Sequence, residues 1–172
     1  SGLGNRRVDY TEIIARETQV NAGVWSKKEA KVITGKNTVK RLENSADLQI
    51  IHNNQPLADE ARPQVAVDVG ELGGMYSGKI HLIGTEKGVG VHNAGHIGAS
   101  AETLKIDSEG RIVNTGILNA NHAVQLAGTK GIENRGKIEN RQGDMTFNTA
   151  ADIQQDGSVV ARGGHIHQTA NQ

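Results

Sequence analysis

The sequence predicts an all-β fold, a parallel β-helix (solenoid) of about 20–21 residues per coil with three short strands in each coil. Two observations predict it: a motif that returns at a fixed period, and aliphatic residues that fall in three clusters within each period. Such a period is typical of stacked repeats, in which each unit buries its apolar face only against its neighbours. Composition agrees, because one Trp, two Tyr and one Phe against 22 Gly suit a narrow aliphatic core.

The repeated motif occurs four times between residue 93 and the C-terminus, with its glycines 21, 20 and 21 residues apart. The copies are NAGHIGA at 93–99, NTGILNA at 114–120, NRGKIEN at 134–140 and QDGSVVA at 155–161. Their glycines, which we expect at the corners of the coil, are Gly95, Gly116, Gly136 and Gly157. Glycine is expected there because it supplies the positive φ that a tight corner needs.

Asn93, Asn114 and Asn134 each stand two residues before a repeat glycine. Stacked coils would place these residues one above another at the strand spacing of roughly 4.8 Å. Side-chain amides can donate and accept hydrogen bonds along such a column, which satisfies groups that would otherwise be buried alone. The sequence therefore predicts a structural asparagine ladder. The alternative is that each Asn-x-Gly is an ordinary exposed turn.

The aliphatic clusters have the periodicity of strands. In Leu104-Lys105-Ile106 two apolar residues flank a polar one, which puts both on the same face of a strand. A helical pattern, suggested by the seven residues between Ile97 and Leu104, would put glycines in helix interiors at roughly 0.5–1 kcal/mol each. The period then predicts two inward columns, namely Leu104, Val124 and Met145 in one and Ile112, Ile132 and Ile153 in the other.

The earlier part of the chain is less regular. Residues 9–12 have capping-box spacing, so 10–17 could form a short helix or equally a strand. Residues 40–64 contain both prolines, and because proline in sheets is confined to edges and loops, they predict an excursion outside the coil. The alternation of valines at 65–69 resumes the coil. We expect a single β-helix domain over residues 1–172, with about seven or eight coils.

Charge and composition exclude several functions. Lys plus Arg equals Asp plus Glu at 19 each, so the chain lacks the basic character of proteins that bind nucleic acid or anionic membranes. No apolar run approaches the roughly 18 residues of a membrane span. The absence of cysteine excludes a disulfide framework and a thiolate metal site. Ser1 begins without a charged and then apolar leader, so we expect a cut from a longer chain.

Two long blocks carry a resemblance to a known family. They are DYTEIIARETQVNAGVW at 9–25 and VDVGELGGMYSGKIHLIGTEKGVGVHNAG at 67–95. They resemble the later part of the secretion domain of two-partner-secretion exoproteins, the filamentous haemagglutinin and CdiA-type adhesins and toxins of Gram-negative bacteria. The resemblance assigns residues 1–92 to that secretion-type domain and residues 93–172 to haemagglutinin-type repeats. It implies a right-handed parallel β-helix, exported by a dedicated outer-membrane transporter and displayed at the cell surface as a long fibre.

Catalytic and metal-binding patterns are not found. Polysaccharide-cleaving β-helices need carboxylates clustered on successive coils, whereas Asp107 here corresponds to Ala127 and Asn148. The repeats contain one ring, Phe147, which we expect to be buried, so platforms for sugar rings are not predicted either. The pair His165-x-His167 could supply half of a metal site, but no third ligand can be named. We expect no enzyme, no cofactor and no metal.

The predicted function is that of a structural segment in a large secreted or surface-displayed adhesin or contact-dependent inhibition protein. Its expected partner is the cognate outer-membrane two-partner-secretion transporter, which it would meet as part of the parent protein. A free-standing carbohydrate- or receptor-binding adhesive module is the alternative, with a receptor or glycan of a host or neighbouring cell as its partner.

Overall fold

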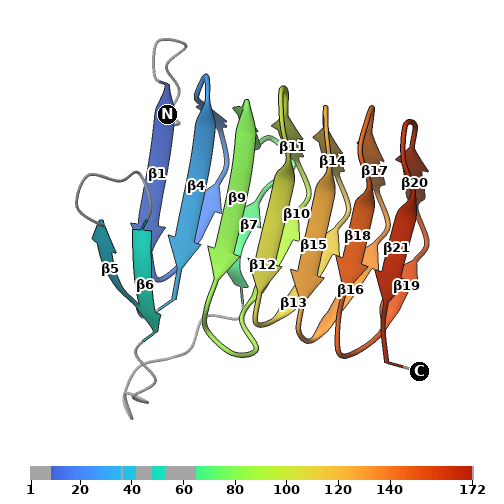
Figure 1. The fold of residues 1–172 in the computed structure, drawn as a ribbon. Helices are drawn as coiled ribbons and strands as arrows, with labels where there is room; N and C mark the ends of the chain where they lie inside the picture. The colour runs from blue at the N-terminus through green and yellow to red at the C-terminus, as the bar shows by residue number, and fades with distance from the viewer. Residues whose placement is uncertain (1–8, 36, 42–47, 53–64, 172) are drawn as a thin grey trace.

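The computed structural model describes residues 9–35, 37–41, 48–52 and 65–171. These residues form strands and no helix, and most of the strands lie in three parallel sheets that wind into one coil (Figure 1). The predicted all-β parallel β-helix is therefore confirmed. Because none of the described residues is helical, they include no helix that could cross a bilayer.

Each coil contributes one strand to each of the three sheets. Sheet 1 consists of β1 (Tyr10–Ala15), β4 (Glu29–Thr34), β9 (Lys79–Gly84), β12 (Leu104–Ser108), β15 (Val124–Gly128), β18 (Met145–Asn148) and β21 (Ile166–Thr169). Sheet 2 consists of β2 (Thr18–Val20), β7 (Val65–Val69), β10 (Gly90–Asn93), β13 (Arg111–Asn114), β16 (Gly131–Asn134) and β19 (Ile153–Gln155). Sheet 3 consists of β3 (Gly23–Trp25), β8 (Gly74–Ser77), β11 (His96–Ala99), β14 (Ile117–Ala120), β17 (Lys137–Asn140) and β20 (Ser158–Ala161).

The coil is right-handed. In Figure 1 the strands of sheet 1 run downward at the front, and the chain returns upward behind them through sheets 2 and 3 as it advances toward the C-terminus. This is the hand that parallel crossover connections adopt almost without exception, because of the right-handed twist of strands.

The number of coils is smaller than predicted. Sheets 2 and 3 have six strands each, so the coil makes about six turns rather than seven or eight. The difference arises between β4 and β7, where the chain adds no coil. Instead β5 (Asn37–Arg41) and β6 (Leu48–His52) form a separate antiparallel pair. This pair agrees with the predicted excursion at 40–64, although β5 begins at Asn37; residues 42–47 and 53–64 lie outside the described part of the chain.

The first element is a strand, so the helical alternative for residues 10–17 is wrong. All six residues of β1 pair in parallel with β4, from Tyr10 opposite Glu29 to Ala15 opposite Thr34. Pairing along the whole of β1 satisfies the backbone groups that face β4, and the pattern of exposed and half-buried residues alternates as a strand requires. The capping-box spacing of residues 9–12 stabilises a helix less than the pairing with β4 stabilises a strand.

The core is a thin aliphatic column that follows the predicted register. Leu104, Val124 and Met145 occupy one column, and all three are fully buried. Ile112, Ile132 and Ile153 form the second predicted column, with Ile153 only partly buried because it belongs to the last coil. Phe147 is buried as predicted, with 1% of its surface exposed.

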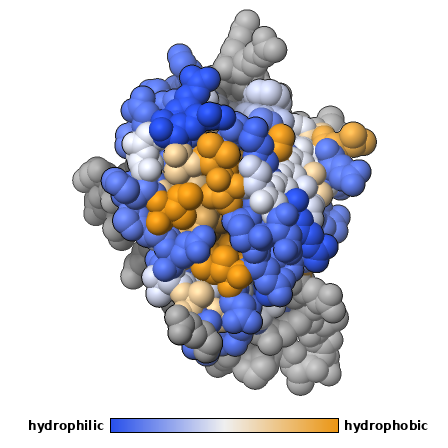
Figure 2. Space-filling view, turned by 90° about the vertical axis from the view of Figure 1, so that its right-hand side faces the viewer, coloured by the Kyte–Doolittle hydropathy of each residue, from blue (hydrophilic) through white to orange (hydrophobic). Residues whose placement is uncertain are grey.

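The C-terminal face of the coil is apolar at its centre. Figure 2 looks onto this face and shows hydrophobic side chains gathered in the middle of a polar rim. The last coil supplies Ile153, Val159 and Ala161, which pack against the core from one side only, and Ile166, which is 44% exposed. The face has the character of a β-helix core in cross-section.

Candidate functional site

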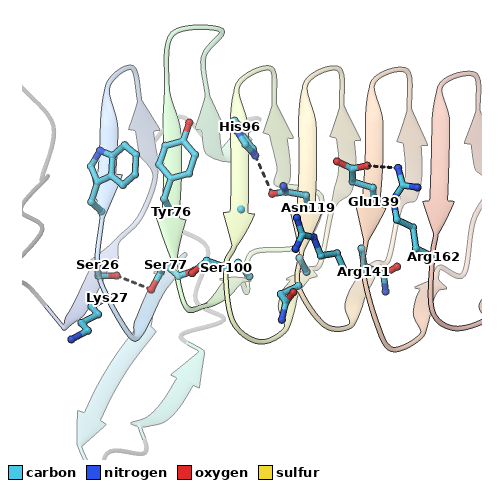
Figure 3. Close-up of a pocket in the computed structure, with 16 residues that line it drawn as sticks. Ser26, Lys27, Tyr76, Ser77, His96, Ser100, Asn119, Glu139, Arg141 and Arg162 are labelled. Carbon is cyan, nitrogen blue, oxygen red and sulfur yellow. Dashed lines mark hydrogen bonds and ion pairs between the residues drawn. The ribbon is translucent and has the colours of Figure 1, made fainter.

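A groove of about 1010 Å³ crosses the outer face of sheet 3. It runs along the coil axis from β3 toward β20, so its walls are built from side chains of successive coils (Figure 3). Because residues on a strand point alternately inward and outward, one outward row of register partners crosses the groove through Tyr76, Gly98, Asn119 and Glu139. We call this surface between Trp25 and Arg162 the groove.

Aromatic rings form the N-terminal end of the groove. Trp25 pairs in register with Tyr76, and their rings stack with centroids 4.2 Å apart and planes at 24°. The ring of His96 meets Tyr76 edge-on at 5.1 Å. A Cβ at Gly74 would lie 2.5 Å from the Tyr76 ring, and one at Gly23 would collide with the indole nitrogen, so these glycines let both rings lie against their own strands.

The middle of the groove is polar. Nε2 of His96 donates a hydrogen bond to Oδ1 of Asn119 over 3.0 Å. Gly98, on the same strand as His96, is the register partner of Asn119, and a Cβ there would stand 2.5 Å from the same Oδ1 atom. The glycine therefore permits the His96–Asn119 bond and leaves this part of the sheet surface uncovered.

Positive charge collects along the turn side of the groove. Lys27, Arg141 and Arg162 are exposed residues that line it. The carboxylate of Glu139 lies 3.6 Å from Arg162 and 3.3 Å from Lys137, which is outside the lining. The lining thus carries three cationic side chains against one carboxylate.

A buried amide lies at the end of β17, on the inward side of sheet 3 next to the groove. Asn140 is 1% exposed, and its Nδ2 donates to the backbone carbonyls of Gln142 at 2.8 Å and Gly143 at 2.9 Å. Its Oδ1 is buried without any hydrogen-bond donor among the described residues. An unpaired buried acceptor of this kind costs about 1–3 kcal/mol.

The predicted asparagines lie in one buried column at the ends of β10, β13 and β16. Nδ2 of Asn93 donates to Oδ1 of Asn114 at 2.9 Å, and Nδ2 of Asn114 donates to Oδ1 of Asn134 at 2.9 Å. The column ends with a 2.6 Å bond from Asn134 to the side chain of Gln155. All three asparagines are at most 3% exposed. They are joined side chain to side chain, away from the groove lining.

The repeat glycines follow this column, but not for the predicted reason. Gly95, Gly116, Gly136 and Gly157 do not have positive φ; among the described glycines that conformation occurs at Gly35, Gly88, Gly131 and Gly143. Glycine is required at these positions because there is no room for a Cβ atom. A Cβ at Gly116 would collide with the carbonyl oxygen of Gly95 in the preceding coil, and the other three positions meet the same obstacle. Glycine lets adjacent coils approach closely at this corner.

The predicted histidine pair shares one carboxylate. His167 Nε2 lies 3.0 Å from Asp144 Oδ2, and the backbone N–H of His165 donates to Asp144 Oδ1 at 2.9 Å. The latter bond is the main reason that the pKa of Asp144 lies below its usual value. Within the described ranges, no group of three or more His, Cys, Asp or Glu side chains is arranged to hold a metal ion. Asp107 stands opposite Ala127, and Ala127 opposite Asn148, as predicted, so these acids do not stack.

Sequence reasoning missed the aromatic end of the groove. Platforms for rings were sought in the repeats, whereas Trp25 and Tyr76 come from earlier coils and are 51 residues apart. A signal was present in the triplets GVW at 23–25 and GMY at 74–76, which share glycine two residues before a ring. Their equivalence shows only when the excursion between β4 and β7 is removed from the period.

Comparison with known proteins gives a consistent family. The family model described as TPS secretion domain matches residues 1–114. The chain is 50% identical over 115 residues to "Toxin CdiA" of Yersinia pestis and 36% identical over 116 residues to "tRNA nuclease CdiA-2" of Burkholderia pseudomallei (strain 1026b). It is 38% identical over 117 residues to "tRNA nuclease CdiA" of Escherichia coli (strain NC101). No solved structure matches.

These similarities cover a small part of the relatives. The matched regions make up 67%, 67% and 65% of this chain but only 3%, 4% and 3% of the three relatives. The chain thus corresponds to the secretion-domain region of very long proteins.

Proposed function

Since this chain belongs to the TPS secretion domain family and is a segment of a two-partner-secretion exoprotein, we propose that it serves as a rigid length of a β-helical rod. Membership implies a cognate outer-membrane transporter and export to the outside or surface of the cell. The rod would carry the distal parts of the parent adhesin or contact-dependent inhibition protein away from that surface. Within it, we propose that residues 1–92 are of the secretion type and residues 93–172 are haemagglutinin-type repeats.

One observation supports the rod above all: the C-terminal face of the coil in Figure 2 is a core in cross-section. A following coil of the same kind would bury Ile166 and complete the burial of Ile153 and Val159. Stacked-repeat proteins generally need such a neighbour or a polar cap at each end. The relatives, of which this chain spans 3–4%, are long enough to provide many more coils.

If the exported chain folded into coils outside the cell, folding would prevent it from sliding back through the transporter. The coil of β12, β13 and β14 buries four aliphatic side chains, which are Leu104, Ile106, Ile112 and Leu118. Each buried side chain of this size contributes roughly 1.5–3 kcal/mol. A chain that crosses the transporter unfolded would gain this free energy coil by coil on the far side, and sliding back would require losing it.

A crosslink between adjacent coils tests this route. Lys105 and Gln125 are register partners on β12 and β15, within the roughly 4.4–6.8 Å between Cα atoms that a disulfide accepts. We expect the double variant Lys105→Cys/Gln125→Cys of the full-length parent to form a normal rod. Its secretion should slow when periplasmic oxidation forms the disulfide before the chain crosses the outer membrane, because the bridge closes a loop in the chain. Reductant should restore the rate of secretion.

Each single cysteine variant provides a matched control, because it cannot close the loop. Bridged chains that form in the periplasm and still appear outside at the normal rate would contradict passage of an unfolded chain. Failure of the bridge to form in the secreted rod would contradict the pairing of these coils instead.

The segment itself is not proposed to be an enzyme. The nuclease named in two of the relatives belongs to those proteins, and the similarity covers their secretion-domain region alone. Any toxic activity of the parent of this chain would come from other parts of it.

A carbohydrate- or receptor-binding adhesive module is the second candidate function, and the groove on sheet 3 favours it. Exposed cations and partly exposed rings and amides are arranged there on the outer face of a sheet. We expect fluorescently labelled protein to adhere to host or neighbouring bacterial cells, and saturable adherence competed by unlabelled protein would be the measurement.

A further inference from the structure

We propose that the groove on sheet 3 binds an acidic oligosaccharide, laid across the strands from Trp25 toward Arg162. The inference deepens the second candidate function, the adhesive module, and is independent of export. It rests on four features of the groove: its rings, its cations, its amides and its direction across the coils.

The rings offer a stacking surface at one end. Trp25 is 46% exposed on β3, the edge strand of sheet 3 among the residues that the structure describes. The stack on Tyr76 holds the indole in place, which lowers the entropy lost on binding. The C–H faces of a pyranose ring are apolar, and a fixed aromatic side chain is a suitable partner for them.

The cations select an acidic chain over a neutral one. Arg141 and Arg162 extend from successive coils on the turn side, and Lys27 lies at the ring end. Guanidinium groups bind carboxylates and sulfates with two parallel hydrogen bonds. Glu139 neutralises part of this charge, and three cations against one carboxylate leave a net positive lining.

The amides supply the polar contacts that hydroxyl groups need. Asn119 and Asn121 line the groove two positions apart on one coil. A polar floor of this kind is poorly suited to an apolar ligand.

The direction of the groove favours a glycan over other polymers. A peptide binds to a sheet through backbone hydrogen bonds at a free strand edge, whereas the groove crosses paired strands. Single-stranded nucleic acid uses a series of stacking platforms, whereas the rings here occupy one end only. An extended glycan can instead present one sugar unit to each coil, because a pyranose is about as long as the roughly 4.8 Å strand spacing.

Tryptophan fluorescence gives a direct readout, because Trp25 is the single tryptophan of the chain. The 172-residue protein should show a saturable change of emission with oligogalacturonate, whose acid is a carboxylate, or with heparin-derived oligosaccharides, which add sulfate. The two arms distinguish the acidic group. A cello-oligosaccharide of equal length, which is neutral, should bind at least about tenfold more weakly.

Variants test whether the oligosaccharide binds in the groove. Their Kd is measured by calorimetry where the tryptophan has been replaced, and by fluorescence otherwise. Arg141→Gln/Arg162→Gln and Trp25→Ala should each raise the Kd about tenfold. The control Lys105→Gln/Lys130→Gln removes two cations outside the groove and should bind as the unaltered protein does. Melting curves should establish that the exposed arginine pair can be changed without loss of folding.

Several outcomes would overturn the inference. One is that neither acidic oligosaccharide binds saturably, and another is that both groove variants bind with unchanged affinity. The third is that oligothymidylate or polyphosphate binds equally tightly, which would indicate a general attraction of anions. If the protein adheres to cells while failing these glycan tests, the adhesive function stands and the glycan inference falls. If neither binding nor adherence occurs, both fall.

Discussion

Nδ2 of Asn114 lies 2.9 Å from Oδ1 of Asn134, although the two residues are twenty positions apart in the sequence. The same Nδ2 also donates to the backbone carbonyl of Lys137 at 3.2 Å, so the amide joins two coils through both side chain and backbone. Each asparagine of the ladder is therefore a crosslink between successive coils as well as a buried polar group.

Replacing the middle asparagine tests the contribution of the ladder. We expect Asn114→Ala to lower the free energy of unfolding by about 1–3 kcal/mol, because it removes buried hydrogen bonds and leaves a small cavity. Asn93 keeps its bond to the carbonyl of Ile117, which limits the loss. Urea unfolding is the measurement, and Asn148→Ala, at an exposed position, is the control. Equal effects of the two changes would contradict a structural ladder.

The repeat glycines are expected to be intolerant of even one methyl group. Gly116→Ala would drive a Cβ into the carbonyl oxygen of Gly95, so we expect a loss of about 1–3 kcal/mol or separation of the two coils. Gly88→Ala is the comparison, because Gly88 has a positive φ of 78° but open space around its Cβ position. If thermal unfolding showed Gly88→Ala to be the more damaging, backbone conformation rather than close approach would dominate in this coil.

The two faces of β15 should respond differently to the same charge. Val124→Asp places a carboxylate between Leu104 and Met145 without a partner, which should cost several kcal/mol. Gln125→Asp, one residue on, points to solvent and should change the melting temperature little. Similar losses in both variants would mean that the inward column is wrongly assigned.

Acid should weaken the coil through Glu133. Its side chain is 8% exposed and is held by Arg111 at 2.8 Å and Arg135 at 2.7 Å. The hydrogen bond from Arg111 is the main cause that lowers the pKa of Glu133 below its ordinary value of 4.5. Because the folded-state pKa is depressed, this stabilisation is complete above pH 4.5 and is lost as pH falls through the folded-state value.

The variant Glu133→Gln isolates this effect from the other carboxyl groups. We expect it to be less stable than the unaltered protein at pH 7, and the gap in melting temperature should narrow as the pH falls below 4.5. A gap that stays constant down to about pH 3 would show that protonation of Glu133 is not linked to stability.

The regular coils of the C-terminal half could be predicted from the sequence, because one period of about 20 residues determines which side chains stack. Leu104 over Val124 follows from that arithmetic alone, as does Asn93 over Asn114. The first coils could not be placed in this way, because β4 pairs with β9 across a gap that contains β5 and β6. The period of the repeats does not predict how many residues an excursion contains before the coil resumes.

The candidate site depends on that same gap. Trp25 and Tyr76 become neighbours only because β3 meets β8 after the excursion, so the groove could not be assembled from adjacent sequence. The helix-or-strand ambiguity of β1 had another cause: local spacing at residues 9–12 suits both, and the pairing with β4 decides. The reason for the repeat glycines was likewise invisible, because the obstructing carbonyl belongs to another coil.

The parallel stacking of the coils also determines how the molecule should respond to tension. Strands lie across the axis and their hydrogen bonds lie along it, so a pull between the two ends loads the bonds of one coil interface at a time. Each coil that opens exchanges roughly 4.8 Å of rod for about 65–70 Å of extended chain. We therefore expect a rod of such coils to lengthen in steps under load, one coil interface after another.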